Sequence, residues 1–531
     1  MSERLANLLN LELAWQRLRF DRPDRIFVTN PYLIELVELD RAGFLRGIRE
    51  QVSRGYIPSP SVTCPVPKGK WQVRPGVYLR LADELVFNAL VGSVFQNIIP
   101  RLQWSQGDPD IAYQLENLNT AVRWVKRGFV VWKEWREKSL QKLQTAEFVL
   151  IADIAAFYEN VDLHRLSSDL RSVNMDDEAG TLLSSCLNRW AEPRGKGIPQ
   201  GHSASDILAK LYLDSIDHNL RNAGFTHLRY VDDIRIFCSD LREAKQALLQ
   251  LSELLRLRGL NVQSAKTRIH RSDEALRVID GVSPVVERIN EELKEEIQTY
   301  DGGEYGTVEE LEEVTAANPE HPPLAVLERA FRNYFVQAQD NDFDPTLFHY
   351  LLTRLAATGS RIAADYCVSI LSKRPEETEY VLRYLGKIER VDQDDQRVFE
   401  YLDTPEALYD YQIFLILRHY WEQGRFLPRL ITYCRSVVRD AGISSYVKAY
   451  AMAILGEAGE NADLEFSEAQ YPLSPDEVQH ATIICSCHRM EVRRRNEFYG
   501  RARNDGALEQ RAVVWVRARE ERREQQDVAA I

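Results

Sequence analysis

The stretch Leu228-Arg229-Tyr230-Val231-Asp232-Asp233-Ile234-Arg235-Ile236-Phe237 decides the fold of this chain. Apolar and polar residues alternate on both sides of two adjacent aspartates, which predicts a β-hairpin with the carboxylates at or near its turn. Neighbouring carboxylates repel each other unless a cation lies between them, and hard cations such as Mg²⁺ take oxygen ligands of this kind. The alternative is an ordinary tight turn, in which Asp is common and keeps the end of the hairpin soluble.

A second apolar run, Glu147 to Asp153, also ends on a carboxylate. It predicts a buried strand that delivers Asp153 beside the hairpin. Three carboxylates placed in this way can hold two Mg²⁺ ions ~4 Å apart and clamp the attacking and leaving oxygens of a phosphoryl transfer. The alternative for Asp153 is a helix N-cap, since a helix is expected just after it, and both roles are compatible. The candidate metal ligands are Asp153, Asp232, Asp233 and, next to Asp153, Ile154.

Between these two segments, a Gly/Pro loop from Gly195 to Ser205 runs into a long predicted helix, Asp206 to Asp217. Glycine in such a loop allows the backbone to approach a ligand closely. For the glycines alone, a plain loop before an N-capped helix is the better interpretation.

Taken together, four segments resemble motifs A, B, C and D of reverse transcriptases in order and spacing. They are Asp153 with Phe157-Tyr158, Ile198-Pro199-Gln200-Gly201 with Ser205, Tyr230-Val231-Asp232-Asp233, and Gly259-Leu260-Asn261 with Lys266-Thr267. Among reverse transcriptases, the chain looks most like the bacterial abortive-infection and other phage-defence enzymes. The reasons are Asp-Ile-Ala-Ala-Phe-Tyr in motif A, the compact motif region, and a long helical C-terminal half without an endonuclease signature.

The resemblance implies an α+β fold with a right-hand polymerase domain over residues 1–285. The fingers would span about 1–145 and the palm about 146–285, with fingers elements interleaved. An acidic linker or thumb-like segment is expected at 286–323, and successive amphipathic patterns predict an all-α, HEAT-like helical-repeat domain at 324–515. A charged tail, 516–531, follows. At 531 residues, the chain is long enough for two or more domains.

The resemblance also implies roles for single residues. In the family, basic fingers residues hold the incoming triphosphate, and Arg74 and Arg80 lead the candidates here over Lys68 and Lys70. Tyr158 would pack under the sugar and exclude a 2′-hydroxyl, which implies deoxynucleotide substrates. Gln200 and Gly201 would line the nucleotide and template, and Lys266 would act near the leaving pyrophosphate, where it could serve as general acid. Each of these side chains also fits a solvated face or a packed core. Asp206 departs from the family pattern, because related enzymes often carry Pro there.

Composition sets further limits. The net charge of −13 is unusual for a nucleic-acid binder, so any cationic groove must be local. Seven scattered cysteines suggest no disulfide framework and fit a reducing cytoplasm. Cys485-Ser486-Cys487-His488 lacks a partner pair at zinc spacing and is interpreted as ordinary helix residues. Neither a signal peptide nor a membrane span is expected.

Three weaker patterns leave alternatives open. The Trp-, Lys- and Arg-rich helix predicted from Ala121 to Leu143 could stack bases along a nucleic-acid backbone or simply pack. The Arg-rich segment from Arg489 to Arg523 could contact nucleic acid, although a solvated helix face is favoured. Leu276 to Gly281 resembles a primer-grip hairpin, and Asp162 is expected to cap a helix.

The functional prediction is a reverse transcriptase-like DNA polymerase in antiviral defence that uses two Mg²⁺ ions, for which Mn²⁺ could substitute. Its partners would be dNTPs, a nucleic-acid product, an RNA or DNA template, a phage-derived trigger and further copies of itself. Template-independent synthesis primed from a protein tyrosine is a further hypothesis, with candidates Tyr409, Tyr411, Tyr446, Tyr450 and Tyr499. The alternatives are a conventional RNA-templated enzyme of another bacterial lineage and a scaffold protein with an inactive palm.

Overall fold

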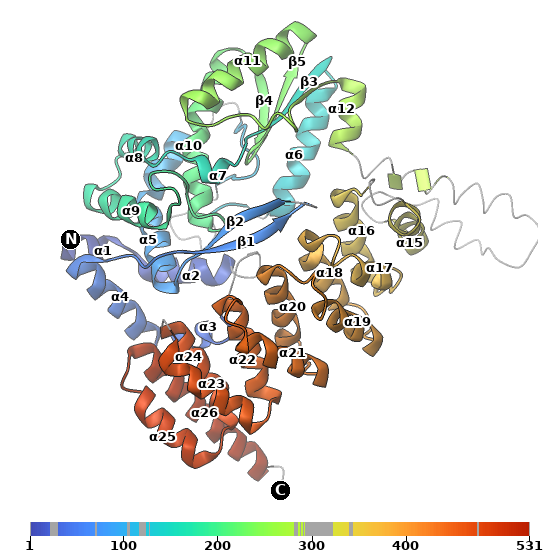
Figure 1. Ribbon diagram of the computed structural model, residues 1–531. Helices are drawn as coiled ribbons and strands as arrows, with labels where there is room; N and C mark the ends of the chain where they lie inside the picture. The colour runs from blue at the N-terminus through green and yellow to red at the C-terminus, as the bar shows by residue number, and fades with distance from the viewer. Residues whose placement is uncertain are drawn as a thin grey trace, which may run out of the picture. The chain divides into compact units, whose positions relative to one another are not determined.

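The computed structural model describes residues 2–21, 30–69, 72–102, 107–115, 124–126, 128–280, 285–286, 288–289, 291, 322–338, 343–474 and 477–529. It is mostly helical with some sheet (Figure 1). The chain divides into two compact units. Unit 1 comprises residues 1–27, 45–63 and 76–281, and unit 2 comprises residues 28–44, 64–75 and 282–531. Most of the predicted acidic linker, 286–323, lies outside the described residues.

Unit 1 is built around a four-stranded antiparallel sheet in the order β4-β5-β3-β6. Its strands are β3 (Phe148–Asp153), β4 (Thr226–Tyr230), β5 (Asp233–Cys238) and β6 (Arg268–Arg271). The hairpin predicted from the alternation is β4-β5, whose Tyr230↔Asp233 pair leaves Val231 and Asp232 as a two-residue turn. The buried strand predicted before Asp153 is β3.

One face of this sheet packs on α6 (Gly128–Leu143) and α12 (Ser272–Ile279). Alternation along the strands puts Val149 and its cross-strand partner Phe237 on this face, in a buried cluster with Val131 of α6 and Ile279 of α12. The same alternation places Asp153 on this face, four residues along β3 from Val149. The opposite side of the sheet is covered by α11 (Leu241–Leu257), which packs on β3 and β5 (Figure 1).

The remaining helices of unit 1 surround the motif segments. Their bounds are α1 (Glu3–Leu8), α2 (Leu11–Asp21), α4 (Arg41–Gly55, whose first residues belong to unit 2), α5 (Leu81–Leu102), α7 (Phe157–Asn160), α8 (Leu163–Ser172), α9 (Asp177–Trp190) and α10 (Ser203–Asn222). Among the described residues, α5 is the one helix long and apolar enough to cross a membrane, but it is mainly a buried core helix. The strands β1 (Val62–Lys68) and β2 (Gln72–Tyr78) pair with each other, and each has residues in both units.

Unit 2 consists of α3 (Leu33–Leu39) and a long run of C-terminal helices (Figure 1). The run contains α15 (Leu324–Phe331), which continues as a π-helical turn (Arg332–Val336), α16 (Pro345–Thr358), α17 (Ala364–Ser369), α18 (Thr378–Leu385), α19 (Asp392–Leu402), α20 (Asp410–Glu422), α21 (Pro428–Arg439), α22 (Ser445–Ala458), α23 (Asn461–Gln470), α24 (Glu477–Ser486), α25 (Val492–Ala502) and α26 (Ala507–Ala529), with short 3₁₀ turns at Pro375–Glu377, Tyr471–Leu473 and Cys487–Arg489.

These C-terminal helices stack in two series. In one series α16, α18, α20, α22, α24 and α26 pack in succession, and in the other α17 packs on α19 and α19 on α21. The helices of the first series begin at Pro345, Thr378, Asp410, Ser445 and Glu477, which are 33, 32, 35 and 32 residues apart. A helical repeat would give stacking at a nearly constant spacing. The HEAT-like repeat domain stays a prediction, and HEAT repeats run to about 40–47 residues.

Candidate active site

The first carboxylate is fixed by strand register. Asp153 is the last residue of β3 and lies directly across from Asp233, the first residue of β5. The backbone joins these segments further, because the Ile154 amide donates to the Asp232 carbonyl at 3.1 Å and the Gln263 amide donates to the Asp153 carbonyl at 2.7 Å. The strand ends therefore bring Asp153, Asp232 and Asp233 to one edge of the sheet, as the sequence predicted.

The turn that carries Asp232 is strained. Val231 has φ +57°, a left-handed conformation that a β-branched residue rarely adopts. A positive φ at the first residue of a two-residue hairpin turn is usually supplied by glycine. The Arg229 guanidinium donates to the Val231 carbonyl at 3.0 Å, so the side chain of one strand residue holds the turn in place.

Arg229 is itself held by a buried ion pair. Its guanidinium lies 2.6 Å from Asp217 on α10 and 3.1 Å from Asp110. Burial alone would raise the pKa of Asp217, but the charge of Arg229, with hydrogen bonds from His227 and Arg229, holds that pKa well below its ordinary value. The hairpin that presents the carboxylates is thus anchored to α10 by charges that have no access to water.

The carboxylate cluster has the electrostatics of a cation site. Burial, followed by repulsion from Asp232 and Asp153, raises the pKa of Asp233 to about 6. Lys266 lies 2.6 Å from Asp153 Oδ2. Burial acts to lower the pKa of Lys266, but the hydrogen bond and charge of Asp153 outweigh it and the pKa is raised. Lys266 is therefore a protonated neighbour of the three carboxylates.

The donor set fits a hard divalent cation, because it consists of carboxylate oxygens that repel one another. In the present side-chain arrangement, however, no group of three or more His, Cys, Asp or Glu side chains among the described residues closes around a single metal position. The ion pair from Lys266 engages one of the Asp153 oxygens. A metal bound here would have to displace that contact.

The motif B loop is fixed at its C-terminal end, where it enters α10. Gly201 has φ +95°, a conformation that glycine adopts without strain. The next residue, His202, contacts the Val77 carbonyl through Nε2 at 2.9 Å and Glu84 through Nδ1 at 3.1 Å. Gln200 precedes this anchor and is half-buried. The loop thus reaches α10 with the His202 side chain bound to the end of β2 and the start of α5.

Tyr158 lies on α7, five residues after Asp153, and is buried. Its hydroxyl donates to Asp206 Oδ1 on α10 at 2.7 Å. The hydroxyl of Tyr113 lies 3.0 Å from the same oxygen and 2.8 Å from the Tyr158 hydroxyl. Sequence reasoning missed this group, although the unexpected Asp206 in motif B was the signal that could have found it.

The two candidate triphosphate ligands are not brought together within one unit. Arg74 is an exposed residue in the part of β2 that belongs to unit 2, whereas Arg80 is half-buried just before α5 in unit 1. Lys68 is half-buried on β1, and Lys70 lies outside the described residues. Their role in nucleotide binding stays a prediction.

Two local predictions were wrong. The supposed primer-grip hairpin at 276–281 is largely helical, because α12 spans Ser272–Ile279 and buries Ala275 and Ile279, one turn apart, against the cluster that contains α6. The motif D pattern also predicts a short strand that begins at Leu260-Asn261, but the strand β6 begins only at Arg268, and Val262 makes an isolated bridge with Ile154. Asp162 does cap a helix, since its side chain accepts from the Arg165 amide of α8.

In the Trp-, Lys- and Arg-rich region predicted as a helix from Ala121 to Leu143, the tryptophans serve mainly in packing. Trp124 is buried under Arg17, whose guanidinium carbon lies 3.9 Å from the ring centroid, and Trp135 is covered by Arg235 at 3.4 Å. Trp132 is partly exposed on α6. Residues 116–123 of this region lie outside the described residues.

The cysteine cluster and the Arg-rich segment belong to the core and surface of unit 2. Cys485 and Cys487 are buried free thiols whose pKa values burial raises. In the Arg-rich segment, six arginines form ion pairs with acidic residues of unit 2, which fits a helix face. They are Arg493, Arg494, Arg495, Arg501, Arg511 and Arg519. Contact with nucleic acid stays a prediction.

Comparison with known proteins gives a family match for part of this chain. Residues 73–296 match the family model for reverse transcriptase, the RNA-dependent DNA polymerase. The chain contains a reverse transcriptase-like domain. The match includes β2, all four strands of the sheet and the carboxylates at its edge. The bacterial abortive-infection subtype is not part of this finding and stays a prediction.

Solved structures also align with this chain, at low identity and low TM-score. A telomerase from Candida albicans, in complex with a fragment of telomeric RNA, aligns over 71% of this chain and 68% of its own, with 12% identity and a TM-score of 0.29. An apo telomerase from Candida tropicalis aligns over 85% of this chain and 76% of its own, with 11% identity and a TM-score of 0.29. A search of curated proteins found no match.

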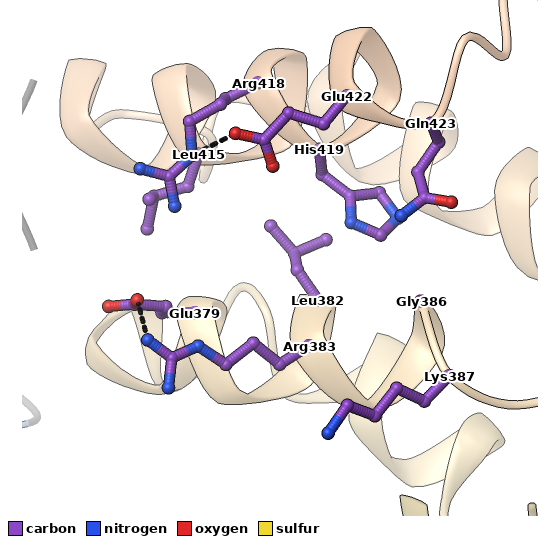
Figure 2. Close-up of a pocket in the computed structure, with 10 residues that line it drawn as sticks. All are labelled: Glu379, Leu382, Arg383, Gly386, Lys387, Leu415, Arg418, His419, Glu422 and Gln423. Atoms are coloured by element: carbon purple, nitrogen blue, oxygen red, sulfur yellow. Dashed lines mark hydrogen bonds and ion pairs between the residues drawn. The ribbon is translucent and has the colours of Figure 1, made fainter. Parts of the chain in front are cut away.

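Unit 2 contains a separate pocket of about 230 Å³ between α18 and α20 (Figure 2). Arg383 pairs with Glu379 at 2.6 Å and Arg418 with Glu422 at 3.7 Å, each within its own helix. Burial, followed by the charges of Arg390 and Arg418, lowers the pKa of the pocket residue His419 to about 4. The pocket walls thus carry charges of both signs around a neutral imidazole.

Proposed function

We propose that this protein is a Mg²⁺-dependent DNA polymerase of the reverse transcriptase type, which transfers nucleotides from dNTPs to a primer hydroxyl. The observation that supports the proposal most directly is the cross-strand pairing of Asp153 with Asp233, beside Asp232 and within reach of Lys266. This arrangement lies in the region that matches the reverse transcriptase family.

In the proposed reaction, the primer hydroxyl oxygen forms a bond to the α-phosphorus of the dNTP, and the bond from that phosphorus to the leaving pyrophosphate breaks. Asp153, Asp232 and Asp233, with Ile154, would hold two Mg²⁺ ions, which lower the pKa of the primer hydroxyl and neutralise the triphosphate. Lys266 donates a proton to the leaving pyrophosphate.

The other predicted residues bind the substrate in this proposal. Arg74 and Arg80 contact the triphosphate, and Gln200 and Gly201 line the base and the template. The ring of Tyr158 lies under the sugar and selects deoxynucleotides, since a 2′-hydroxyl would collide with it. A role in antiviral defence, a phage-derived trigger, a homo-oligomeric state and a cytoplasmic location complete the proposal and rest on the family resemblance.

Burial favours one of the five tyrosines that were candidates for protein priming. Tyr411, Tyr446, Tyr450 and Tyr499 are each at most 5% exposed, so a polymerase could not reach their hydroxyls in the folded protein. Tyr409, which precedes α20, is only half-buried. If synthesis is primed from one of these five residues, we propose Tyr409.

The test is incorporation of labelled dNTPs by purified protein with Mg²⁺, with and without RNA or DNA template, resolved on a denaturing protein gel. Wild type should incorporate label, and the double variant Asp232→Ala, Asp233→Ala should not. Label that migrates with the protein without template, and is lost in Tyr409→Phe but not in Tyr411→Phe, supports priming from Tyr409. Free product that needs RNA template indicates a conventional reverse transcriptase. Wild-type incorporation no higher than in the double variant would count against the proposal and favour the scaffold alternative.

A further inference from the structure

Two tyrosine hydroxyls from separate parts of unit 1 meet at one carboxylate oxygen of Asp206. Tyr158 comes from the single-turn helix after Asp153, Tyr113 from the loop at 107–115, and Asp206 from the first turn of α10. Their contacts of 2.7, 3.0 and 2.8 Å form a closed triangle of oxygen atoms. The ring of Tyr158 is therefore held at its far end by two residues distant in sequence.

The protonation states of the three groups determine which of them donate and which accept hydrogen bonds. An ionised carboxylate only accepts hydrogen bonds, and charge-assisted bonds of this kind are shorter and roughly twice as strong as neutral ones. Burial, followed by the charge of Asp206, raises the pKa values of Tyr113 and Tyr158 well above their ordinary values. Both phenols therefore keep their protons, so each hydroxyl can donate to Asp206 Oδ1, and the 2.8 Å contact between the two phenol oxygens shares one of the same two hydrogens.

The backbone of α7 needs such an anchor. Ala156, at the start of this four-residue helix, has φ +45°, so the chain enters the helix through a strained left-handed residue. A single turn has no further turns to fix its orientation. The Tyr158 ring packs edge-on against Phe157 at 5.3 Å, but the specific contacts at its hydroxyl come from Asp206 and Tyr113.

The anchor itself is rigidly placed. The Asp206 amide donates to the His202 carbonyl at 3.3 Å, and the His202 ring contacts Val77 and Glu84 through both of its nitrogens. The start of α10 is thus tied to β2 and α5, and Asp206 transmits that fixed position to Tyr158.

We propose that Asp206 and Tyr113 are positioning residues that hold the Tyr158 ring in place and so set the discrimination between dNTPs and rNTPs. This inference rests on the proposed function, in which the sugar lies against Tyr158. A ring released from its hydroxyl anchor can tilt away from the sugar, and the space that opens admits a 2′-hydroxyl. The loss of the anchor should therefore act mainly on the binding of rNTPs.

The experiment measures kcat and KM for a dNTP and the matching rNTP in wild type, Asp206→Ala, Tyr113→Phe and Tyr158→Phe, with Tyr158→Ala as a reference. We expect Asp206→Ala to lower the dNTP/rNTP ratio of kcat/KM by roughly tenfold or more, as the loss of a charge-assisted hydrogen bond implies. The change should lie chiefly in a lower KM for the rNTP. Tyr113→Phe, which removes one oxygen atom, should give a smaller shift in the same direction. Asp206→Asn retains an acceptor and should recover most of the discrimination lost in Asp206→Ala.

Asp162→Ala is the matched control, because Asp162 is a carboxylate of the same segment that caps α8 and does not contact Tyr158. It should lower stability without changing the ratio. An unchanged ratio in Asp206→Ala and Tyr113→Phe, with a lowered ratio in Tyr158→Ala, overturns this inference and leaves the proposed function intact. Should Asp206→Ala fail to fold, Tyr113→Phe decides alone.

Equilibrium binding of dATP and ATP in the presence of Ca²⁺ separates the inference from the polymerase proposal. If wild type synthesises nothing, the proposed function fails, but a preference for dATP that Tyr113→Phe reduces would still support the positioning role. Equal binding of dATP and ATP by wild type would overturn it.

Discussion

The ammonium of Lys266 lies 2.6 Å from Asp153 Oδ2. It therefore occupies a position beside this carboxylate that a hard cation would take. Mg²⁺ and this ammonium therefore compete for the same carboxylate. We expect Lys266→Met to bind Mg²⁺ about threefold more tightly in calorimetry without nucleotide, since a half-exposed ion pair contributes only ~0.5–1 kcal/mol. Lys245→Met, an exposed residue of α11, should leave the affinity unchanged. Weaker binding in Lys266→Met would show that Lys266 does not compete with the metal.

Val231 stores strain beside Asp232. A β-branched residue at φ +57° costs roughly 1–2 kcal/mol relative to glycine. We expect Val231→Gly to raise the free energy of unfolding by ~1 kcal/mol and the thermal midpoint by about 2–4 °C, and to lower polymerase activity because the turn becomes freer. Val262→Gly, at a position without positive φ, should lower the midpoint. A lower midpoint in Val231→Gly as well would contradict the strain argument.

Site residues could be predicted from the sequence where a pattern of neighbouring residues marks their position. Asp153, Asp232 and Asp233 end or begin strands with clear alternation, so their positions were readable. Asp206 acts through Tyr158 and Tyr113, which are 48 and 93 residues away in the chain. No local pattern encodes such a contact.

At the scale of helices and strands, periodicity predicted well wherever burial agreed with it. The hairpin β4-β5 and the strand β3 alternate because each has distinct faces. The segment Leu276 to Ile279 also alternates at short range, but the burial of Ala275 and Ile279, four residues apart, makes it a helix. The helix α19 has three acidic residues among its first four positions. Its apolar pattern was therefore too weak to predict this helix individually from the sequence.

The helix pair α18 and α20 provides a pH-dependent element (Figure 2). Burial with Arg390 and Arg418, opposed by Asp395, lowers the pKa of His419 from 6.5 to about 4. The unfolded chain therefore binds a proton first as pH falls. The stability that comes from a neutral His419 is complete above pH ~6.5 and is lost progressively toward pH ~4, by ~2 kcal/mol at pH 5.

Urea unfolding at pH 7 and pH 5 measures this loss. Wild type should lose more stability between the two values than His419→Gln, and the difference between the variants isolates the histidine from the other titrating groups. A pH dependence identical in both proteins would contradict the burial of a neutral imidazole at this position.

At the scale of the whole molecule, unit 2 is not a simple C-terminal segment. Tyr32 packs edge-on against Trp421 and Trp515, with ring centroids 5.4 and 5.2 Å away. Asn30 donates to Thr482 at 2.6 Å, and the Trp515 indole donates to Glu35 at 2.9 Å. The sequence predicted linear domains with a boundary at residue 285, because patterns along a chain do not reveal which distant segment covers a short helix such as α3.

A fragment of residues 1–285 would lack the partners of α3. We expect it to expose Tyr32, Leu36 and Val37, which are buried in the whole protein, to bind a hydrophobic dye and to melt well below the full chain. Adding the fragment 286–531 should reduce dye binding. A 1–285 fragment as stable as the full chain, with no dye binding, would instead establish the linear domain prediction.

The position of α3 also sets the timing of synthesis. The ribosome releases Leu33–Leu39 more than 460 residues before α26 begins at Ala507. At about 5–20 residues per second, α3 waits roughly 20–90 s for its partner helix. Throughout that interval its apolar face is available to chaperones and to other nascent chains. Any chain released before α26 is made lacks a helix that covers this face, so such a truncated chain keeps the apolar side of α3 exposed.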